Sequence, residues 1–256
     1  MTDPVVFADV EAAARRIGGS VHRTPIITSR ALDALAGRRL FFKCENLQRA
    51  GAFKVRGAMN AVALVRSLGN AQAVATHSSG NHGAALALAA QESGLAATVV
   101  MPENSAAPKI AAVGRFGAQI VLCKPGRVAR EAALAEVLKA RGVEAVHPYD
   151  DRRVIAGQGT AAQEFLVEQT DLDALIVPVG GGGLLAGTLV AAHAMHPDLP
   201  VFAGEPAQAD DAARSLAGGE RVLLDAPETV ADGLRASLGA LNFELTRRYC
   251  RGIFTV

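Results

Sequence analysis

The sequence has no tryptophan, and aromatic residues make up only 4% of its 256 positions. It has no apolar run long enough to span a bilayer, and its N-terminal stretch MTDPVVFADVEAAARR has no signal-peptide core. Neither sign of charge dominates, with 26 Lys and Arg against 25 Asp and Glu. We therefore expect a cytoplasmic protein with a small-molecule partner, and neither a nucleic-acid nor a membrane partner.

Cysteine is also scarce. Cys44, Cys123 and Cys250 lie far apart, are odd in number and form no metal-binding spacing, which indicates a reducing compartment. In contrast, half of the residues are apolar, so the chain can bury a sizeable core, and its 26 glycines cluster. These features are typical of a cytosolic enzyme with glycine-rich loops that expose their backbone groups.

Apolar strand-like segments alternate with segments of helical period. The predicted strands are 39–45, 73–77, 97–101, 119–123, 174–179 and 201–205, and the predicted helices are 55–68, 81–93, 128–141, 154–169 and 184–195. Such alternation predicts an α/β fold with parallel sheets. Residues 174–179 read as a strand buried on both faces. Seams near 67–72 and 148–153 predict a small domain, 69–150, inserted into a larger one formed by 1–68 and 151–256.

Lys54 stands among small and apolar residues in ENLQRAGAFKVRGAMNAV, where a helix is predicted to begin. The positive end of that helix and burial both disfavour an ammonium, so both lower the pKa of the amine. A neutral amine can attack an aldehyde and form a Schiff base. The ordinary alternative is a lysine whose stem covers apolar surface while its amine reaches water.

Two further stretches are typical of anion binding. In THSSGNHGAALALAA (76–90), Ser78, Ser79 and Asn81 lie where a helix N-terminus follows a strand, which favours a carboxylate; ordinary helix capping is the alternative. In ALIVPVGGGGLLAG (174–187), four glycines follow a strand, and their backbone can wrap around a phosphate. Gly181, Gly183 and Ala186 also satisfy G-x-G-x-x-A, which keeps an NAD-binding oxidoreductase open as an alternative, with Glu205 as its acidic residue.

The stretch GEPAQADDAARS (204–215) offers oxygen ligands from Glu205, Asp210 and Asp211. Hard cations such as Mg²⁺ and Ca²⁺ take such ligands together with carbonyl groups and water. Capping of a helix by the two aspartates, with a salt bridge to Arg214, is the simpler interpretation of the residues alone.

Taken together, these motifs resemble the fold-type II pyridoxal-phosphate enzymes, and within them the serine/threonine dehydratases (ammonia-lyases) and serine racemases. The resemblance rests on ENLQRAGAFKVRGAMNA, SSGNHG, HPYDDRRVIAGQGTAAQE, GGGGLLAG and ETVADGLRAS, and it covers essentially the whole chain. Cysteine and threonine synthases are disfavoured because their lysine motif usually reads S-x-K-D-R, whereas this one reads AFKVRG. The resemblance implies a tryptophan-synthase-β-like fold of two three-layer domains.

The resemblance also implies roles for individual residues. Lys54 would bind pyridoxal 5'-phosphate covalently and act as the catalytic base, with Ser79 as the second catalytic residue. The remaining cofactor contacts would come from Phe53 beside the ring, Asn81 at its phenolic oxygen, Gly180, Gly181, Gly182 and Gly183 at the phosphate, and Gly233. Ser78, Ser79, Asn81 and His82 would bind the substrate, and Glu205, Ala209 and Asp211 would hold Mg²⁺ or another divalent cation.

The implied reaction is β-elimination from L-threonine or L-serine, which gives a 2-oxo acid and ammonia. Serine racemase and 3-hydroxyaspartate dehydratase activities remain alternatives, and Arg130 could meet the second carboxylate of 3-hydroxyaspartate or could be a solvated helix residue. A homodimer is the usual form in the family. Members continue beyond the final GIFTV to supply a partner for the ring nitrogen, so we expect the C-terminal part of the fold to be missing from these residues.

Overall fold

The computed structural model describes residues 5–78, 80–225 and 227–256. Its α-helices are α1 (Phe7–Ile17), α2 (Arg30–Ala36), α3 (Lys54–Leu68), α4 (Asn81–Ser93), α5 (Ala107–Gly114), α6 (Arg127–Val137), α7 (Arg152–Glu168), α8 (Gly183–Met195), α9 (Asp211–Gly218) and α10 (Ala240–Tyr249), and its 3-10 helices are η1 (Glu45–Leu47), η2 (Arg49–Gly51) and η3 (Asp232–Leu234). The strands are β1 (Ile26–Ile27), β2 (Phe42–Lys43), β3 (Ala73–His77), β4 (Ala96–Pro102), β5 (Gln119–Cys123), β6 (Val143–Ala145), β7 (Leu175–Pro178), β8 (Val201–Glu205) and β9 (Gly252–Thr255).

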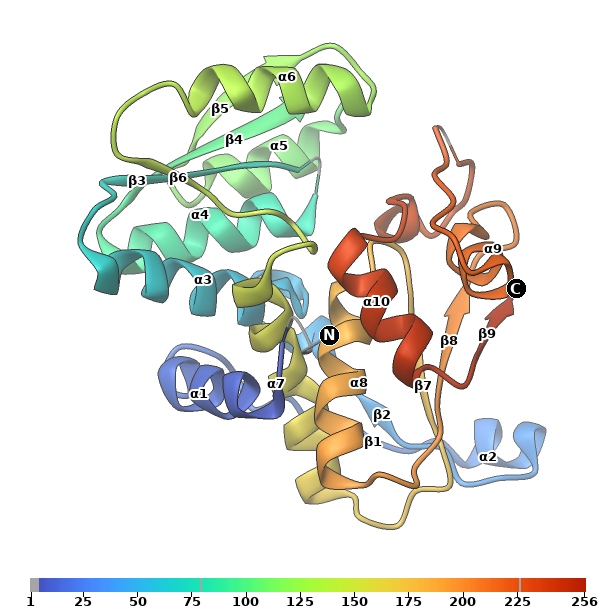
Figure 1. Ribbon diagram of the computed structural model, residues 1–256. Coiled ribbons are helices and arrows are strands. Elements are labelled where there is room, and N and C mark those ends of the chain that lie inside the picture. Colours follow the sequence, from blue (N-terminus) through green and yellow to red (C-terminus); the bar gives the residue numbers. More distant parts are fainter. Residues whose placement is uncertain (1–4, 79, 226) are drawn as a thin grey trace.

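One sheet has the strand order β5-β4-β3-β6, and all of its neighbours pair in parallel. Helix α6 lies on one face of this sheet, and α4 and α5 lie on the other (Figure 1). The strands fall between residues 73 and 145. The division into a small domain, 69–150, and a larger one stays a prediction.

A second parallel sheet has the order β7-β8-β9, and α8 and α10 pack beside it around a core that includes Leu185, Leu189 and Leu238. The prediction of parallel sheets is therefore confirmed. The prediction that 174–179 is buried on both faces is wrong, because burial alternates along β7 and the side chain of Ile176 is 69% exposed. Only one face of β7 packs against this core.

Several predicted boundaries hold and others do not. Strands 73–77, 119–123 and 201–205 have the expected ends. The strand predicted for 39–45 shrinks to β2, which pairs antiparallel with β1 over two residues. Helix α6 ends at Val137, short of the expected 141. In these places local apolar content overstated the length of the element, since hydrogen-bonding partners decide where a strand or helix stops.

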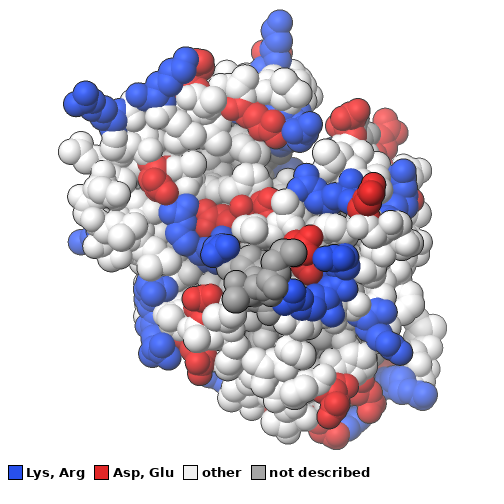
Figure 2. All heavy atoms as spheres, in the orientation of Figure 1, with Lys and Arg blue, Asp and Glu red and all other residues white. Residues whose placement is uncertain are grey.

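On the face of the molecule shown in Figure 2, basic and acidic side chains are interspersed, and no large area carries charge of one sign only. This agrees with the balanced charge of the sequence. In the described ranges, no helix has both the length and the apolar character needed to cross a bilayer.

Candidate active site

Lys54 is the first residue of α3, and its amine turns inward. The Nζ atom donates a hydrogen bond to the carbonyl of Pro148 at 2.8 Å and lies 5.2 Å from the ring centre of Phe53 and 5.9 Å from that of Tyr149. The residue as a whole is half-buried, but its amine is enclosed. Burial lowers the pKa of Lys54 to about 8, because an ammonium loses its hydration there. About half of the Lys54 amine is therefore neutral at a pH of about 8, where an ordinary lysine is almost fully charged.

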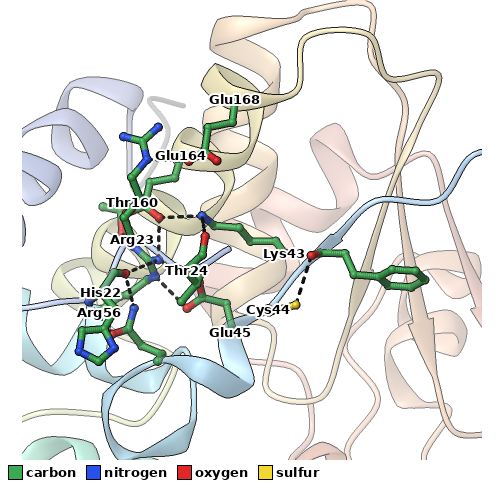
Figure 3. Close-up of polar contacts among 12 residues, drawn as sticks. His22, Arg23, Thr24, Lys43, Cys44, Glu45, Arg56, Thr160, Glu164 and Glu168 are labelled. Carbon is green, nitrogen blue, oxygen red and sulfur yellow. Dashed lines mark hydrogen bonds and ion pairs between the residues drawn. The ribbon is translucent and has the colours of Figure 1, made fainter. Parts of the chain in front are cut away.

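A buried guanidinium fixes the chain on both sides of Lys54. Arg56 is fully buried and donates to both carboxylate oxygens of Glu45 (2.8 and 2.9 Å) and to both of Glu164 on α7 (2.7 and 2.8 Å), as Figure 3 shows. Lys43 pairs with Glu164 from the other side at 2.9 Å. Burial alone would raise the pKa of Glu164, but the hydrogen bonds and the charge of Arg56 outweigh it and hold this pKa below its usual range. The network joins η1, α3 and α7 around the base of the lysine.

Helices α3 and α7 come unusually close just after Lys54. A Cβ atom on Gly157 would lie 2.6 Å from the carbonyl oxygen of Arg56 and from the Cα of Gly57. Only glycine permits this approach, since a side chain would push the two backbones apart. The contact sets the distance between Lys54 and the residues that precede α7, including Pro148.

The four glycines connect β7 to α8 and have almost no room for side chains. A Cβ atom on Gly181 would lie 2.4 Å from the ring of Tyr149, and one on Gly182 would lie 2.4 Å from Leu238. Gly182 has φ +90°, a conformation that favours glycine. Since Tyr149 contacts Gly181 and its ring also faces Lys54, one tyrosine connects the amine with the glycine run.

Gly233 lies in η3, next to the glycine run. A Cβ atom on Gly180 would lie 2.9 Å from the Cα of Leu234, the residue that follows Gly233. The structure therefore brings Lys54, Phe53, the glycine run and Gly233 into one region.

Helix α4 begins at Asn81, directly after Gly80, so a helix N-terminus follows β3 as expected. The backbone N–H of Gly80 donates to the Oγ of Ser78 at 3.3 Å, and Asn81 is exposed in the first turn. Ser79 lies outside the described residues. His82 is only 2% exposed and its Nε2 lies 3.4 Å from the carbonyl of Val146. The His82 side chain therefore belongs to the core, and its backbone amide is the group that faces the helix N-terminus.

A group of aromatic side chains that the sequence did not assign a role lies beside Lys54. The rings of His77 and His147 meet edge-on with centres 5.4 Å apart, and those of His147 and Tyr149 do so at 4.7 Å. Burial, followed by the charges of His147 and Arg130, lowers the pKa of His77 to about 4. Burial also lowers the pKa of His147 and raises that of Tyr149. The motif HPYD between β6 and α7 was the sequence signal for this group.

The residues predicted to hold a metal lie at the end of β8 and the start of α9. The Glu205 carboxylate accepts backbone N–H groups from Ala213 (2.7 Å) and Ala212 (3.2 Å), and Asp211 accepts that of Leu238 (2.8 Å). Burial raises the pKa of Glu205 to about 7 and that of Asp211 to about 6. Ala209 is buried beside them. The described residues contain no group of three His, Cys, Asp or Glu arranged for a metal, so the site would depend on two carboxylates and carbonyl oxygens.

The oxidoreductase alternative gains no support from this geometry. Glu205 would have to bind a ribose, yet its residue is 1% exposed and both of its oxygens accept backbone N–H groups at α9. Gly181 and Gly183 instead pack against Tyr149, whose ring centre lies 5.9 Å from the Lys54 amine.

Comparison with known proteins agrees with this arrangement. The family model "Pyridoxal-phosphate dependent enzyme" matches residues 17–256. The β-hydroxyaspartate dehydratase of Paracoccus denitrificans is 48% identical over 250 residues, which cover 97% of this chain and 79% of that protein. The maize serine racemase structure has a TM-score of 0.96 at 40% identity and covers 98% of this chain and 77% of its own.

The structure of a threonine deaminase from T.th. has a TM-score of 0.93 at 43% identity and covers 98% of this chain and 82% of its own. These relatives carry racemase, dehydratase and deaminase names on one fold. The chain therefore belongs to the fold-type II pyridoxal-phosphate-dependent enzymes, in the group that contains the serine racemases and the serine/threonine dehydratases.

Proposed function

We propose that this chain catalyses pyridoxal-phosphate-dependent β-elimination from L-threonine or L-serine, which yields a 2-oxo acid and ammonia. The observation that carries the proposal is the enclosed amine of Lys54, whose pKa is lowered to about 8, beside a glycine run that leaves no room for side chains. The group fits these residues: its aldehyde needs a neutral amine, and its phosphate needs backbone N–H groups free of side chains. When bound, the cofactor supplies an electron sink for the carbanion.

The protein residues divide the remaining work. Lys54 would hold the cofactor and would act as the general base that removes the Cα proton of the substrate. Backbone N–H groups would receive the phosphate, and they would come from Gly180, Gly181, Gly182, Gly183 and the nearby Gly233. Phe53 would contact the cofactor ring, because the Phe53 ring centre lies 5.2 Å from the Lys54 amine.

The substrate carboxylate would bind at the N-terminus of α4. The side chains of Ser78 and Asn81 and the backbone amide of His82 lie there, where the helix dipole favours an anion. Asn81 would also reach the phenolic oxygen of the cofactor. Ser79 would carry the proton on the opposite side of the substrate in a racemase.

A direct experiment tests the covalent link. The protein, purified with pyridoxal phosphate, is reduced with borohydride and digested, and the modified peptide is identified by mass spectrometry. The expected adduct lies on Lys54. A pyridoxyl group on another lysine, or none, would remove the proposal, and release of ammonia from serine separates an active enzyme from a ligand-binding homologue without turnover.

One observation favours 3-hydroxyaspartate as a second candidate substrate. Arg130 on α6 is half-buried, its charge acts on the buried His77 and Tyr149, and no ion pair between described residues includes it. A guanidinium without a carboxylate partner among those residues suits a substrate with a second carboxylate. The 48% identity to a β-hydroxyaspartate dehydratase points the same way.

Relative kcat/KM values discriminate between these substrates. If 3-hydroxyaspartate is the substrate, Arg130→Met should lower its kcat/KM by about 10-fold or more, the cost of a charged hydrogen bond, and should leave that of serine nearly unchanged. Equal effects on both substrates would eliminate a carboxylate contact. Formation of D-serine from L-serine, measured in the same assay, tests the racemase alternative.

We also propose that Glu205, the Ala209 carbonyl and Asp211 bind a divalent cation, because Mg²⁺ and Ca²⁺ accept carboxylate and carbonyl ligands, and a carboxylate oxygen that accepts one N–H group keeps a lone pair for a small cation. The thermal midpoint should rise on addition of MgCl2 or CaCl2 to chelator-treated protein. It should not rise in Asp211→Asn. A midpoint that is indifferent to both cations in the wild type would refute the site.

A further inference from the structure

The carbonyl group of Gly181, inside the glycine run, is held by two donors from the start of α10. The Nδ2 of Asn242 donates to it at 2.6 Å, and the backbone N–H of Gly239 does so at 3.1 Å. Asn242 has no exposed surface. Its side chain therefore stabilises one orientation of the peptide group that joins Gly181 to Gly182.

The chemistry of the partners fixes the orientation of the Asn242 carboxamide. Its Nδ2 also donates to the carbonyl of Tyr149 at 3.1 Å, so both partners are acceptors and only the NH2 group can face them. The carboxylate of Asp150 accepts the N–H groups of Ala240 (2.9 Å) and Leu241 (2.8 Å), which holds the first turn of α10 in place. Asn242 thereby ties the glycine run to the segment that carries Tyr149.

A trans peptide group directs its N–H opposite to its C=O. Because the Gly181 carbonyl points toward Asn242, the N–H of Gly182 points away from α10. No hydrogen bond found among the described residues uses the N–H groups of Gly181, Gly182 or Gly183, whereas the carbonyl of Gly182 accepts the N–H of Ala186 at 2.8 Å. Within the run, the carbonyls of Gly181 and Gly182 therefore accept hydrogen bonds from the protein, and the N–H groups of Gly181, Gly182 and Gly183 have no acceptor among the described residues.

We propose that Asn242 is a positioning residue of the phosphate site, which directs the Gly182 N–H toward the cofactor phosphate by holding the Gly181 carbonyl. The inference rests on the proposed function, because the phosphate belongs to the proposed cofactor. It assigns to α10 a part in cofactor binding without contact with the cofactor.

The test compares pyridoxal 5'-phosphate with pyridoxal, which has the same aldehyde and no phosphate. In Asn242→Ala and Asn242→Asp, the dissociation constant for pyridoxal phosphate should rise by about 10-fold or more, the cost of losing hydrogen bonds to a charged group. The constant for pyridoxal should stay within about 2-fold of the wild-type value. Inorganic phosphate should compete for cofactor binding more weakly in both variants.

Asn60→Ala is the matched control. Asn60 is 1% exposed and its Nδ2 donates to the carbonyl of Arg153 at 2.7 Å, so the change removes an equally buried carboxamide far from the glycine run in sequence. It should lower stability and leave the preference for the phosphorylated form unchanged. A parallel loss in Asn60→Ala, or an equal loss for pyridoxal in the Asn242 variants, would show a general effect of stability and would overturn the inference.

A measurement on the wild type covers the case in which the variants do not fold. Inorganic phosphate should shift the amide resonance of Gly182, and an unmoved resonance at saturation would overturn the inference. If the wild type binds no pyridoxal phosphate, the proposed function fails as well. If it binds and folded Asn242 variants retain full affinity, only the role of Asn242 is lost.

Discussion

At the scale of single residues, the site depends on an amine whose charge is disfavoured. Lys54 has its pKa lowered to about 8 by burial, against 10.5 for an ordinary lysine. Between these two values the unfolded chain binds a proton that the folded chain does not, so stability rises with pH across that interval. Below it both states are protonated, and the cost of burying the charge remains.

The first prediction concerns this amine directly. The rate at which unliganded protein forms an adduct with pyridoxal should increase with pH, with a midpoint near the Lys54 pKa of about 8. The absorbance of the adduct measures the rate. Lys54→Met should abolish this adduct formation. In a separate assay, Lys54→Ala should lower turnover of the amino-acid substrate by at least about 10³-fold, as loss of a general base does. A midpoint near that of ordinary lysines would contradict the effect of burial.

A second prediction concerns the glycine run. In Gly181→Ala the new methyl group would overlap the Tyr149 ring, which it would approach to 2.4 Å. Displacement of the ring should cost about 1–3 kcal/mol of stability and weaken cofactor binding. Gly218→Ala is the control, since nothing lies within 4 Å of its Cβ position. Chemical denaturation and cofactor titration measure both quantities, and equal behaviour of the two variants would refute the contact.

At the scale of elements, the position of Lys54 is set by how α3 packs on α7. The two helices join through the glycine contact at Gly157 and through the pairing of Arg56 with Glu164. The glycine contact depends on the absence of a side chain at position 157, and the ion pair depends on a buried guanidinium whose N–H groups are hydrogen-bonded. Loss of either should act on the lysine through the backbone.

The third prediction separates the buried Arg56 network from surface ion pairing. Arg56→Met should lower the free energy of unfolding by about 3–5 kcal/mol, because it leaves buried carboxylates unpaired. Arg127→Met, which removes an exposed pair with Glu131 (54% and 49% exposed side chains), should cost no more than about 0.5 kcal/mol. Denaturant titration gives both values. Similar values for the two variants would mean that the Arg56 network contributes no more than a surface pair.

At the scale of the whole molecule, an ion pair joins the four-stranded sheet region to the loop beside the glycine run. Lys109 on α5 pairs with Asp232 in η3, and the two are separated by 123 positions in sequence. Their side chains are 38% and 55% exposed, so the pair contributes little to global stability. The pair should instead have a local effect, which is to hold α5 and η3 close together.

The fourth prediction follows from this placement. Asp232→Lys should speed hydrogen exchange in the peptides that contain α5 and η3, with a change of less than about 1 kcal/mol in global stability. The double exchange Lys109→Asp with Asp232→Lys should restore slow exchange. If the single variant leaves exchange unchanged at low salt, the pair does not hold the two regions together.

The sequence was most informative where chemistry and local pattern agree. It placed Lys54 at a helix start and the glycine run between β7 and α8, because glycine content, helical period and the lysine's neighbours are all local properties. It predicted that His82 would bind the substrate, and it did not show that the His82 side chain is buried in the core although the residue lies in the first turn of α4. Nor did it identify Tyr149 or Asn242, since their roles depend on contacts with Gly181, more than 30 positions away for Tyr149 and 61 for Asn242.

The neutral imidazoles beside Lys54 have a consequence for how the protein responds to acid. Burial lowers the pKa of His77 to about 4, and it also lowers the pKa values of His82 and His147. Histidine is the usual sensor of mild acidity, and burial moves the pKa of each of these three imidazoles to lower pH than that of an ordinary histidine. We therefore expect a loss of activity below neutrality to come from the Lys54 amine, or from Glu205 and Asp211, whose pKa values are raised to about 7 and about 6, before it comes from these imidazoles.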